Sequence, residues 1–582
     1  MKSFFKYVLA TLVGIMLSFM LFLIIMTVIV VQSAKSTSTQ VDANSVLYIS
    51  LGHGITEKEQ KTPLDDLNLP GFVKSLGLDA ILDRIEAAKE DDKIKGIYLN
   101  PSAVGAGTAT INAIRNALED FKSSGKFVYA FSDFYTQQAY YVASSADSVF
   151  MNPQGTLDFR GISSSVMFMK DALDKLGVDV QVVKVGSYKS AVEPFIQGGM
   201  SPENREQVTS YVNSLYDNML APISASRKIS TDSLKNIAAT FASRTPEGAL
   251  SSGLVDELIY KEQFIAKIKN ALKIDQDKDV STVSILDYKP TSKGNKGSGR
   301  IGVLYAFGDI IDGEGMQDNI GGDRISRELR KLRENDRIDA VVLRVNSPGG
   351  SALASEVIWR EVELTKKEKP VIVSMGDYAA SGGYYISAAA DSIFADPSTL
   401  TGSIGVFAMI PNVQNLLNNK LGVRFESVST SPMAEFGTAP DRPLNQEELD
   451  LMQSLVDNVY DTFLTRVADG RKMSKEAVHE IAQGRVWTGE QAIGIGLVDR
   501  LGGLEDAIAS AATMAELESY KVTKYPLSED PWSTLFQSSK EKIKSKWIEE
   551  EMGEFSEYIL ELKSILGRTG VQARIPYEVN IK

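Results

Sequence analysis

Short apolar runs alternate with amphipathic stretches along most of the chain. Residues 325–335 are charged and helical in period, and they precede the run "AVVLRV" (340–345) and a second apolar run, "PVIVSMG" (370–376). The small-residue stretch 381–390 follows, which is typical of a closely packed helix. Strands that alternate with helices predict βαβ units, so we expect an α/β fold with largely parallel sheets.

The same pattern occurs twice. Segment 127–154 aligns without gaps on 371–398, and "EDDKIKGIYL" (90–99) aligns on "ENDRIDAVVL" at the same offset of 244 residues. "GLVDEL" near the end of the first copy returns as "GLVDRL" near the end of the second. Several matches in the same order indicate an internal duplication, so we expect two tandem domains of one fold.

The composition changes at the borders of the two copies. The stretch between them, "KPTSKGNKGSGR", is polar and rich in Gly and Ser, which is typical of a linker. The stretch after the second copy is highly charged and helical in period. The expected segments are a cytoplasmic tip and transmembrane anchor (1–32), a first repeat (40–288), a linker (289–300), a second repeat (301–515), and a C-terminal helical extension and tail (516–582).

The segment Tyr7–Val31 contains no charged residue. Its roughly 25 residues are enough for a helix to cross a bilayer core of about 30 Å. A secretory signal is the alternative, but its apolar region is usually about 7–15 residues long. Lys2 and Lys6 precede the span, so the positive-inside rule places the N-terminus in the cytoplasm. We expect a single-pass protein of the cytoplasmic (inner) membrane, with the rest of the chain on the periplasmic, extracytoplasmic side.

One difference between the copies falls at the start of a helix. Ser381 stands in the second copy where the first has Gln137. Its neighbours in "AASGGYY" are small, and it opens a helix directly after a strand. Such a hydroxyl is accessible, and N–H groups at a helix start favour developing negative charge, so Ser381 is a candidate nucleophile. The same features also fit an N-cap serine with small neighbours for close packing.

A serine nucleophile needs a base, and a Ser–Lys dyad is the common arrangement that fits this chain. His53 and His479 lie in no loop that adjoins the Ser381 turn, whereas Lys189 follows an apolar strand in "KVGSYKSAVEPF". The counterpart of Lys189 in the second copy is Ala434, so each copy lacks what the other retains. This complementary loss predicts one composite site across the two copies; the alternative for Lys189 is a solvated surface position.

The chemistry sets a condition on the surroundings of Lys189. With an ordinary pKa near 10.4, keeping the amine neutral at pH 7 costs roughly 4–5 kcal/mol. Burial lowers the pKa of a lysine, whereas a nearby carboxylate raises it. We therefore expect Lys189 to lie in apolar or Tyr-lined surroundings without a close carboxylate.

The overall composition excludes several classes of function. The net charge is −13 at pH 7, which argues against nucleic acid as a partner. The chain has no Cys, so disulfides, thiol catalysis and thiolate metal sites are excluded. We expect no metal and no cofactor.

Four motifs together resemble a known family. "NSPGGS" (346–351), "AASGGYYIS" (379–387), "TLTGSIGV" (399–406) and "GSYKSAVEPF" (186–195) are found in order at compatible spacings. They resemble the signal peptide peptidase A family, peptidase family S49, in its long tandem-repeat form, over roughly residues 40–515 plus the anchor. The resemblance implies tandem Clp protease/crotonase-like domains and a membrane-anchored serine endopeptidase that forms a homotetramer. It also implies that the substrates are cleaved signal peptides and other apolar peptides.

The resemblance further implies a role for five residues. Ser381 would be the nucleophile and Lys189 the general base, and Ser403 would help to orient the lysine. The backbone N–H groups of Gly350 and Gly382 would form the oxyanion hole.

The turn "NSPGGS" changes in step with the nucleophile. In the first copy it aligns on "SAVGAG" (102–107), where Gly105 stands opposite Gly349 but Ala106 replaces Gly350. The turn is intact only in the copy that has the serine, which favours an oxyanion hole over an ordinary loop. Three alternatives are a crotonase-like acyl-CoA hydrolase, an inactive membrane scaffold with a protease fold, and a protease that digests misfolded membrane proteins.

Overall fold

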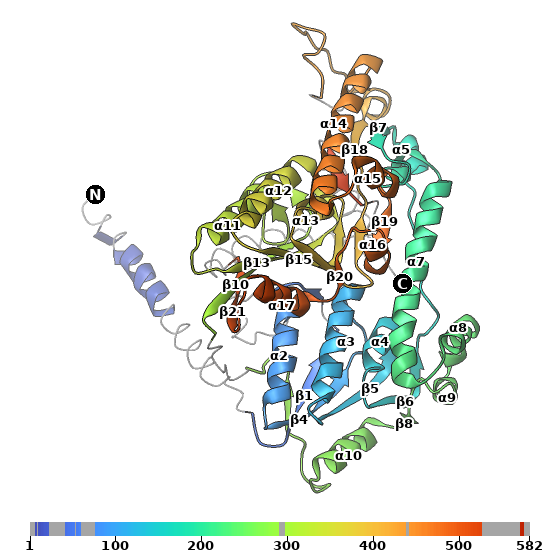
Figure 1. Ribbon diagram of the computed structural model, residues 1–582, viewed down its shortest axis with the longest axis vertical. Coiled ribbons are helices and arrows are strands. Elements are labelled where there is room, and N and C mark those ends of the chain that lie inside the picture. The colour runs from blue at the N-terminus through green and yellow to red at the C-terminus, as the bar shows by residue number, and fades with distance from the viewer. Residues whose placement is uncertain are drawn as a thin grey trace.

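Each copy of the repeat folds around a mainly parallel sheet (Figure 1). The computed structural model describes residues 6–7, 10–22, 41–52, 54–59, 76–289, 297–437, 441–526 and 571–575. In the first copy the strand order is β8-β6-β5-β4-β1-β9, and all neighbours run parallel. These strands are β1 (Ser45–Ser50), β4 (Ile94–Asn100), β5 (Phe127–Tyr135), β6 (Ser148–Leu157), β8 (Glu257–Leu258) and β9 (Thr282–Ser284).

The sheet of the second copy has the order β19-β17-β15-β13-β10-β21, with β16 beside β15 and β20 beside β16. The strands predicted at 340–345 and 370–376 correspond to β13 and β15. The sheet comprises β10 (Gly299–Phe307), β13 (Ala340–Ser347), β15 (Val371–Ala380), β16 (Ser392–Ala395), β17 (Leu400–Gly402), β19 (Val486–Thr488), β20 (Arg500–Leu501) and β21 (Tyr520–Tyr525).

The helices confirm the duplication. Three helices of the second copy begin 244 residues after their counterparts: Gly322 after Leu78, Ala352 after Thr108 and Gln446 after Pro202. The first copy contains α2 (Leu78–Glu90), α3 (Thr108–Lys122), α4 (Gln137–Ala143), α5 (Lys170–Leu176), α6 (Glu193–Ile196), α7 (Pro202–Arg227), α8 (Thr231–Thr240), α9 (Pro246–Ser251) and α10 (Lys261–Leu272). The second contains α11 (Gly322–Glu334), α12 (Ala352–Lys366), α13 (Gly382–Ser387), α14 (Gln446–Arg471), α15 (Lys475–Ile481), α16 (Gly489–Gly494) and α17 (Leu504–Met514).

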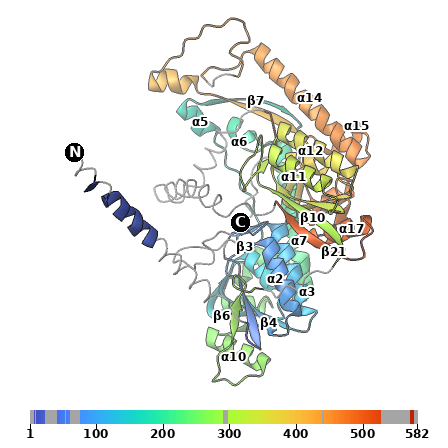
Figure 2. The same cartoon turned by 90° about the vertical axis from the view of Figure 1, so that its left-hand side faces the viewer.

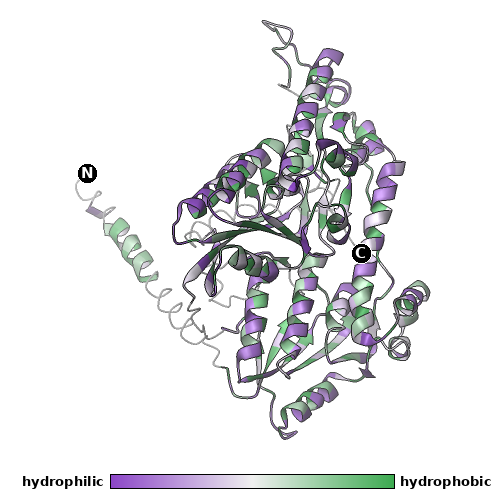
Figure 3. Ribbon diagram, viewed as in Figure 1, coloured by the Kyte–Doolittle hydropathy of each residue, from purple (hydrophilic) through white to green (hydrophobic). Residues whose placement is uncertain are grey.

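Both faces of the second sheet are buried, which explains why its strands read as continuous apolar runs. Along β13, Val341, Leu343 and Val345 belong to one hydrophobic core, whereas Ala340 and Val342 belong to another. This alternation follows from the two-residue period of a strand. The first core packs against α11, α12 and α13, and the second packs against α17. In Figure 3 the strands are accordingly mainly green, while the covering helices mix green and purple residues.

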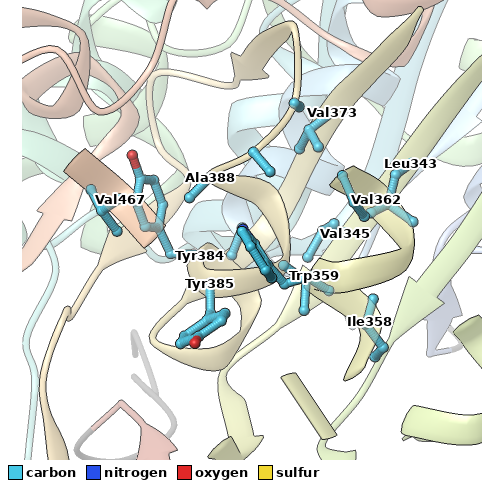
Figure 4. Packing of buried hydrophobic residues seen from close by; sticks show 14 of the residues in the cluster. Leu343, Val345, Ile358, Trp359, Val362, Val373, Tyr384, Tyr385, Ala388 and Val467 are labelled. Carbon is cyan, nitrogen blue, oxygen red and sulfur yellow. The ribbon is translucent and has the colours of Figure 1, made fainter. Parts of the chain in front are cut away.

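The first of these cores supports the helix that follows Ser381. Figure 4 shows Val345 of β13 among Trp359 of α12 and the two tyrosines of α13, Tyr384 and Tyr385. The Tyr384 hydroxyl donates to the Leu497 carbonyl oxygen at 2.8 Å. The aligned Tyr140 donates in the same way to Leu254, also at 2.8 Å, so the two copies share this anchor.

A third sheet joins the two copies. Its order is β12-β11-β14-β22-β18-β7, with β7 (Asp179–Val185), β11 (Ile310–Ile311), β12 (Ile320–Gly321), β14 (Gly349–Ser351), β18 (Val406–Asn412) and β22 (Gln572–Arg574). Strand β7 comes from the first copy, yet it pairs antiparallel with β18 of the second over its whole length. Both views place β7 beside α14 and away from the first sheet (Figure 1, Figure 2). A short fourth sheet pairs β2 (Ile55–Thr56) with β3 (Leu76–Gly77).

Buried polar groups also connect the copies. The Arg344 guanidinium of β13 donates to both carboxylate oxygens of Glu57, at 2.9 and 3.2 Å, and Asn346 donates to Glu57 at 2.7 Å. Asp377 of β15 accepts two hydrogen bonds from Thr110 at the start of α3. Removing one partner of such a buried pair leaves an unpaired charge, so these contacts fix how the copies dock.

The predicted membrane anchor lies only partly within the described residues. Residues 10–22 are helical and coloured as hydrophobic in Figure 3, whereas 23–31 are not described. Among the helices that the structure describes, none has both the length and the apolarity that a bilayer crossing requires.

The predicted C-terminal boundaries need correction. The sequence predicts a helical extension from residue 516, but Tyr520–Tyr525 forms β21 parallel to β10, and Gln572–Arg574 forms β22. The segment "YKVTKY" forms the edge strand of the second sheet, as β9 forms an edge strand of the first. Residues 527–570 of the predicted extension lie outside the described residues, and Gly299 and Arg300 of the predicted linker already belong to β10.

Candidate active site

Ser381 lies in a strained turn between β15 and α13. Its backbone has φ 55° and ψ −113°, a conformation that residues with a side chain rarely adopt. Its side chain is fully buried and makes no capping hydrogen bond to α13. Ser381 thus stands at the N-cap position of α13 without capping the helix through its side chain, and its Oγ atom lies 2.8 Å from Lys189 Nζ instead.

The glycines after Ser381 allow α13 to pack very closely. A Cβ atom at Gly382 would lie 2.7 Å from Ser355 Oγ of α12, and one at Gly383 would lie 2.7 Å from the Ser347 carbonyl oxygen of β13. Both distances are well inside van der Waals contact, so a side chain at either position would displace the helix. The close packing expected for "AASGGYY" is thus present next to a serine that does not cap the helix.

Lys189 reaches Ser381 from the other copy. It follows β7, and the pairing of β7 with β18 carries it into the second copy. Its Nζ atom lies 2.8 Å from Ser381 Oγ, 3.0 Å from the Ser403 carbonyl oxygen and 3.1 Å from Ser403 Oγ. The structure therefore brings together three residues that the sequence analysis singles out.

The surroundings of Lys189 match those expected for a neutral amine. The side chain is fully buried, and this burial alone lowers the pKa of Lys189 well below its ordinary value of 10.5. Its aliphatic part passes between two glycines: a Cβ at Gly484 would lie 2.6 Å from Lys189 Cβ, and one at Gly405 would lie 3.2 Å from Lys189 Cδ. Gly484 has φ +82° and carries no signal in the sequence, because its importance lies only in this contact.

The nearby carboxylate of the same motif is held by other partners. Glu193 is fully buried and accepts hydrogen bonds from Ser201 Oγ at 2.6 Å and Asn204 Nδ2 at 2.8 Å, at the N-terminus of α7. Glu193 therefore fixes the segment that follows Lys189 to α7. Its place in the sequence gives no indication of this role.

Ser403 also contacts the amine of Lys189, through its carbonyl oxygen and its hydroxyl. It is fully buried with φ 49°, and its hydroxyl donates to the Gly484 carbonyl oxygen at 3.2 Å. The lone pairs of Ser403 Oγ are then available to an N–H of Lys189. The two N–H groups of a neutral amine can donate to the two Ser403 oxygens, which leaves its lone pair facing the Ser381 hydroxyl. This geometry suits Lys189 as a proton acceptor.

The two predicted oxyanion donors lie at neighbouring positions. Gly350 belongs to β14, and Gly382 is the first residue of α13. Between them stands Gly349, which has φ +102°; a Cβ there would lie 2.9 Å from Gly382 N. Only glycine adopts this backbone readily, and only glycine leaves the space in front of Gly382 N open. The comparison of the copies gives no signal for Gly349, because Gly105 stands at the same place in the first copy.

In the first copy, Gln137 stands at the position that aligns with Ser381. The Gln137 side chain bonds to the backbone: Oε1 accepts from Arg160 N and Gly161 N, and Nε2 donates to the Gly161 carbonyl oxygen. A cavity of about 600 Å³ lies beside it and is lined by Val104, Tyr141 and other residues of this copy. Gln137 thus stands, bonded to the backbone, at the position that Ser381 has in the second copy.

His479, the histidine that the structure describes, makes its side-chain contact away from Ser381 and Lys189. His479 belongs to α15, where its Nδ1 atom lies 3.0 Å from the Tyr460 hydroxyl. His53 lies outside the described residues.

Comparisons with known proteins agree with this architecture. The model of peptidase family S49 matches residues 120–275 and 363–518, once in each copy, and the Clp protease model matches 293–399. Protease 4 of Salmonella typhi is 41% identical over 457 residues, which cover 76% of this chain and 73% of that protein. Protease 4 of Haemophilus influenzae is 36% identical over 507 residues (84% and 82%). The chloroplastic serine protease SPPA of Arabidopsis thaliana is 33% identical over 466 residues (78% and 68%).

Proposed function

Because the chain belongs to peptidase family S49 and is a serine protease with tandem Clp protease-like α/β domains, we propose that Ser381 and Lys189 form its catalytic dyad. The observation that carries the proposal is the hydrogen bond of 2.8 Å between Lys189 Nζ and Ser381 Oγ. The burial that lowers the pKa of Lys189 makes the amine available as a proton acceptor near neutral pH.

In the proposed reaction, Ser381 Oγ attacks the carbonyl carbon of a peptide bond, and its proton passes to Lys189 Nζ. The carbonyl oxygen becomes an oxyanion that accepts hydrogen bonds from the N–H groups of Gly350 and Gly382, each worth about 3 kcal/mol in comparable sites. The intermediate then expels the amine, which takes the proton from Lys189. Water cleaves the ester on Ser381 by the same steps, with Lys189 again accepting a proton.

Ser403 acts in this scheme as a positioning residue. Its two oxygens hold the N–H groups of Lys189 at 3.0 and 3.1 Å, so the lone pair of the amine keeps its direction toward Ser381. It does not touch the substrate.

We further propose that the substrates are cleaved signal peptides and other apolar peptides at the outer face of the cytoplasmic membrane. The uncharged segment Tyr7–Val31, preceded by Lys2 and Lys6, supports an anchor with the catalytic part on the extracytoplasmic side. The homotetramer implied by the family resemblance completes the proposal. Mass measurement of the detergent-solubilised protein tests the tetramer, and protease protection in spheroplasts tests the orientation.

Hydrolysis of a fluorogenic apolar peptide by the purified full chain tests the dyad. We expect Ser381→Ala and Lys189→Ala each to lower kcat/KM by at least about 10³-fold. Ser187→Ala and Lys184→Ala, which alter the same segment without touching Ser381, serve as matched controls and should retain activity. Undiminished hydrolysis in either dyad variant contradicts the assignment.

A further inference from the structure

A buried amide side chain clamps the segment that carries the candidate base. Gln207 belongs to α7 and is 1% exposed. Its Nε2 atom donates to the Tyr188 carbonyl oxygen and to Ser190 Oγ, both at 2.9 Å. These acceptors belong to the residues immediately before and after Lys189. A primary amide has two N–H groups, so this side chain holds the backbone on both sides of the lysine.

The oxygen of the same amide reaches the second copy. Gln207 Oε1 accepts a hydrogen bond from Val486 N, the first residue of β19, at 3.2 Å. The two residues before Val486 hold Ser403, whose backbone N–H donates to the Arg485 carbonyl oxygen at 2.7 Å and whose hydroxyl donates to the Gly484 carbonyl oxygen at 3.2 Å. Gln207 therefore joins the segment of the candidate base to the strand that holds the serine contacting its amine.

The two copies differ at the position of Gln207. Helix α14 begins 244 residues after α7, so Leu451 of α14 aligns with Gln207. Leu451 is 41% exposed, whereas Gln207 is buried. Burying an amide costs free energy unless its hydrogen bonds are made, and here they are made to the residues that flank Lys189. The copy with the lysine thus has the glutamine, and the copy without the lysine has an apolar residue there.

Charged groups near this segment are held by partners other than the Lys189 amine. Ionisable side chains on the neighbouring elements include Lys184, Tyr188, Glu193, Glu206 and Arg485. Glu206 accepts from the Tyr188 hydroxyl at 3.1 Å and forms an ion pair with Arg485 at 3.0 Å. Glu193 bonds to the start of α7, and Lys184 Nζ lies 3.5 Å from the Lys189 carbonyl oxygen. Burial is therefore the cause that lowers the pKa of Lys189, and this pKa depends on where the amine is held.

We propose that Gln207 is a positioning residue that holds Lys189 in its buried place beside Ser403, a proposal that rests on the Ser381–Lys189 dyad. Gln207 acts through the lysine and not on the substrate. Without its amide, the segment around Lys189 can move relative to β19, and the amine gains water. Its pKa then rises, because hydration favours the charged form. At a given pH, a smaller fraction of the enzyme then has the neutral amine that accepts the proton of Ser381.

The dependence of kcat/KM on pH tests the proposal. The purified full chain hydrolyses a fluorogenic apolar peptide between pH 6 and pH 10. Gln207→Met removes the hydrogen bonds at similar size, and we expect the acid limb of the profile to move up by about one pH unit, which is a loss of about tenfold on that limb. Activity should recover toward the alkaline plateau, with little change in KM. Gln207→Glu keeps the acceptor for Val486 N but lacks both N–H groups and adds a negative charge, so its acid limb should move at least as far.

A second glutamine provides the matched control. Gln491 also links α7 to β19, because its Nε2 atom donates to Ser210 Oγ at 3.0 Å and its Oε1 atom accepts from Thr488 N at 3.1 Å. These contacts lie outside the Lys189 segment, so Gln491→Met should retain the wild-type kcat/KM and the wild-type acid limb. An equal shift of the acid limb in Gln491→Met and Gln207→Met assigns the effect to a loosened α7 and overturns the proposal.

Other outcomes separate the role of Gln207 from the dyad. A Gln207→Met that loses activity by one factor at every pH, or that loses none, overturns the positioning role. Ser190→Ala removes one of the two acceptors and should shift the acid limb in the same direction by less. If Gln207→Met does not fold, an unchanged acid limb in Ser190→Ala overturns the role. An active Lys189→Ala overturns the dyad and the role together, whereas an inactive Lys189→Ala beside an unchanged Gln207→Met overturns the role alone.

Discussion

Replacing Lys189 with methionine should abolish catalysis and yet stabilise the fold at neutral pH. Burial holds the pKa of Lys189 well below 10.5, whereas the unfolded chain has the ordinary value. Where the amine is neutral in the folded protein and charged in the unfolded one, the unfolded state binds one more proton. The free energy of unfolding therefore rises with pH, by about 1.4 kcal/mol per pH unit in that window. At pH 7, taking the proton from a group of pKa 10.5 costs folding about 5 kcal/mol.

Methionine has no proton to lose, but it also makes none of the hydrogen bonds of the amine. The contacts of Nζ with the two oxygens of Ser403 are worth about 1 kcal/mol each, and leaving those oxygens unpaired costs up to about 2 kcal/mol more. The net expectation at pH 7 is a stabilisation of about 1–3 kcal/mol. At pH 9 the cost of removing the proton falls to about 2 kcal/mol, so the advantage of methionine disappears.

The measurement is denaturant unfolding of the full chain at pH 6, 7, 8 and 9. The Lys189→Met variant and its parent both carry Ser381→Ala, so that proteolysis does not interfere. Lys184→Met, which removes a half-buried lysine from β7, controls for the loss of one positive charge. A difference in the free energy of unfolding between Lys189→Met and its parent that is the same at all four pH values contradicts the expected titration of Lys189. A variant that is less stable than its parent at pH 6 contradicts it as well.

Three further predictions concern residues around the dyad and the interface of the copies. Ser403→Ala should lower kcat by about 10–100-fold with little change in KM, because the amine loses one of the acceptors that orient it; steady-state kinetics against pH measures this. Gly349→Ala should lower kcat/KM by at least about 100-fold, because its Cβ would lie 2.9 Å from Gly382 N and fill the space in front of this proposed oxyanion donor, and an unchanged value would contradict the proposed hole. Burial raises the pKa of Asp396 from 3.8 to about 6, so the folded protein binds this proton more tightly and the free energy of unfolding rises by up to about 3 kcal/mol as the pH falls from 7 to 4. Asp396→Asn should remove that rise, as measured by unfolding at both pH values.

Some parts of the site are predictable from the sequence because they differ between the copies. Ser381 and Lys189 stand out because each lacks a counterpart in the other copy. The structure places Lys189 Nζ 2.8 Å from Ser381 Oγ. Gly349 and Gly484 give no such signal, because their importance depends on which atoms approach them in space. The pairing of β7 with β18 is equally hidden, since "DVQVVKV" predicts a strand but not its partner.

The tail illustrates the same limit more strongly. "QAR" has no period of its own, and it is a strand only because β14 and β18 offer hydrogen-bonding partners on both sides. The preceding sequence has a helical period and therefore predicts a helix, not a strand, for the tail. A short segment whose conformation is set by its partners cannot be assigned from local pattern.

The division of the dyad between two copies couples activation of the base to folding. Lys189 belongs to the first copy, but the groups that enclose it, among them Gly405 and Gly484, belong to the second. Before the copies dock, the lysine is solvated and has an ordinary pKa, so it is protonated and cannot accept the proton of Ser381. Docking removes water from the amine and simultaneously brings it to the serine. In the proposed mechanism, therefore, an incompletely folded chain has neither the geometry nor the protonation state needed to cleave peptides.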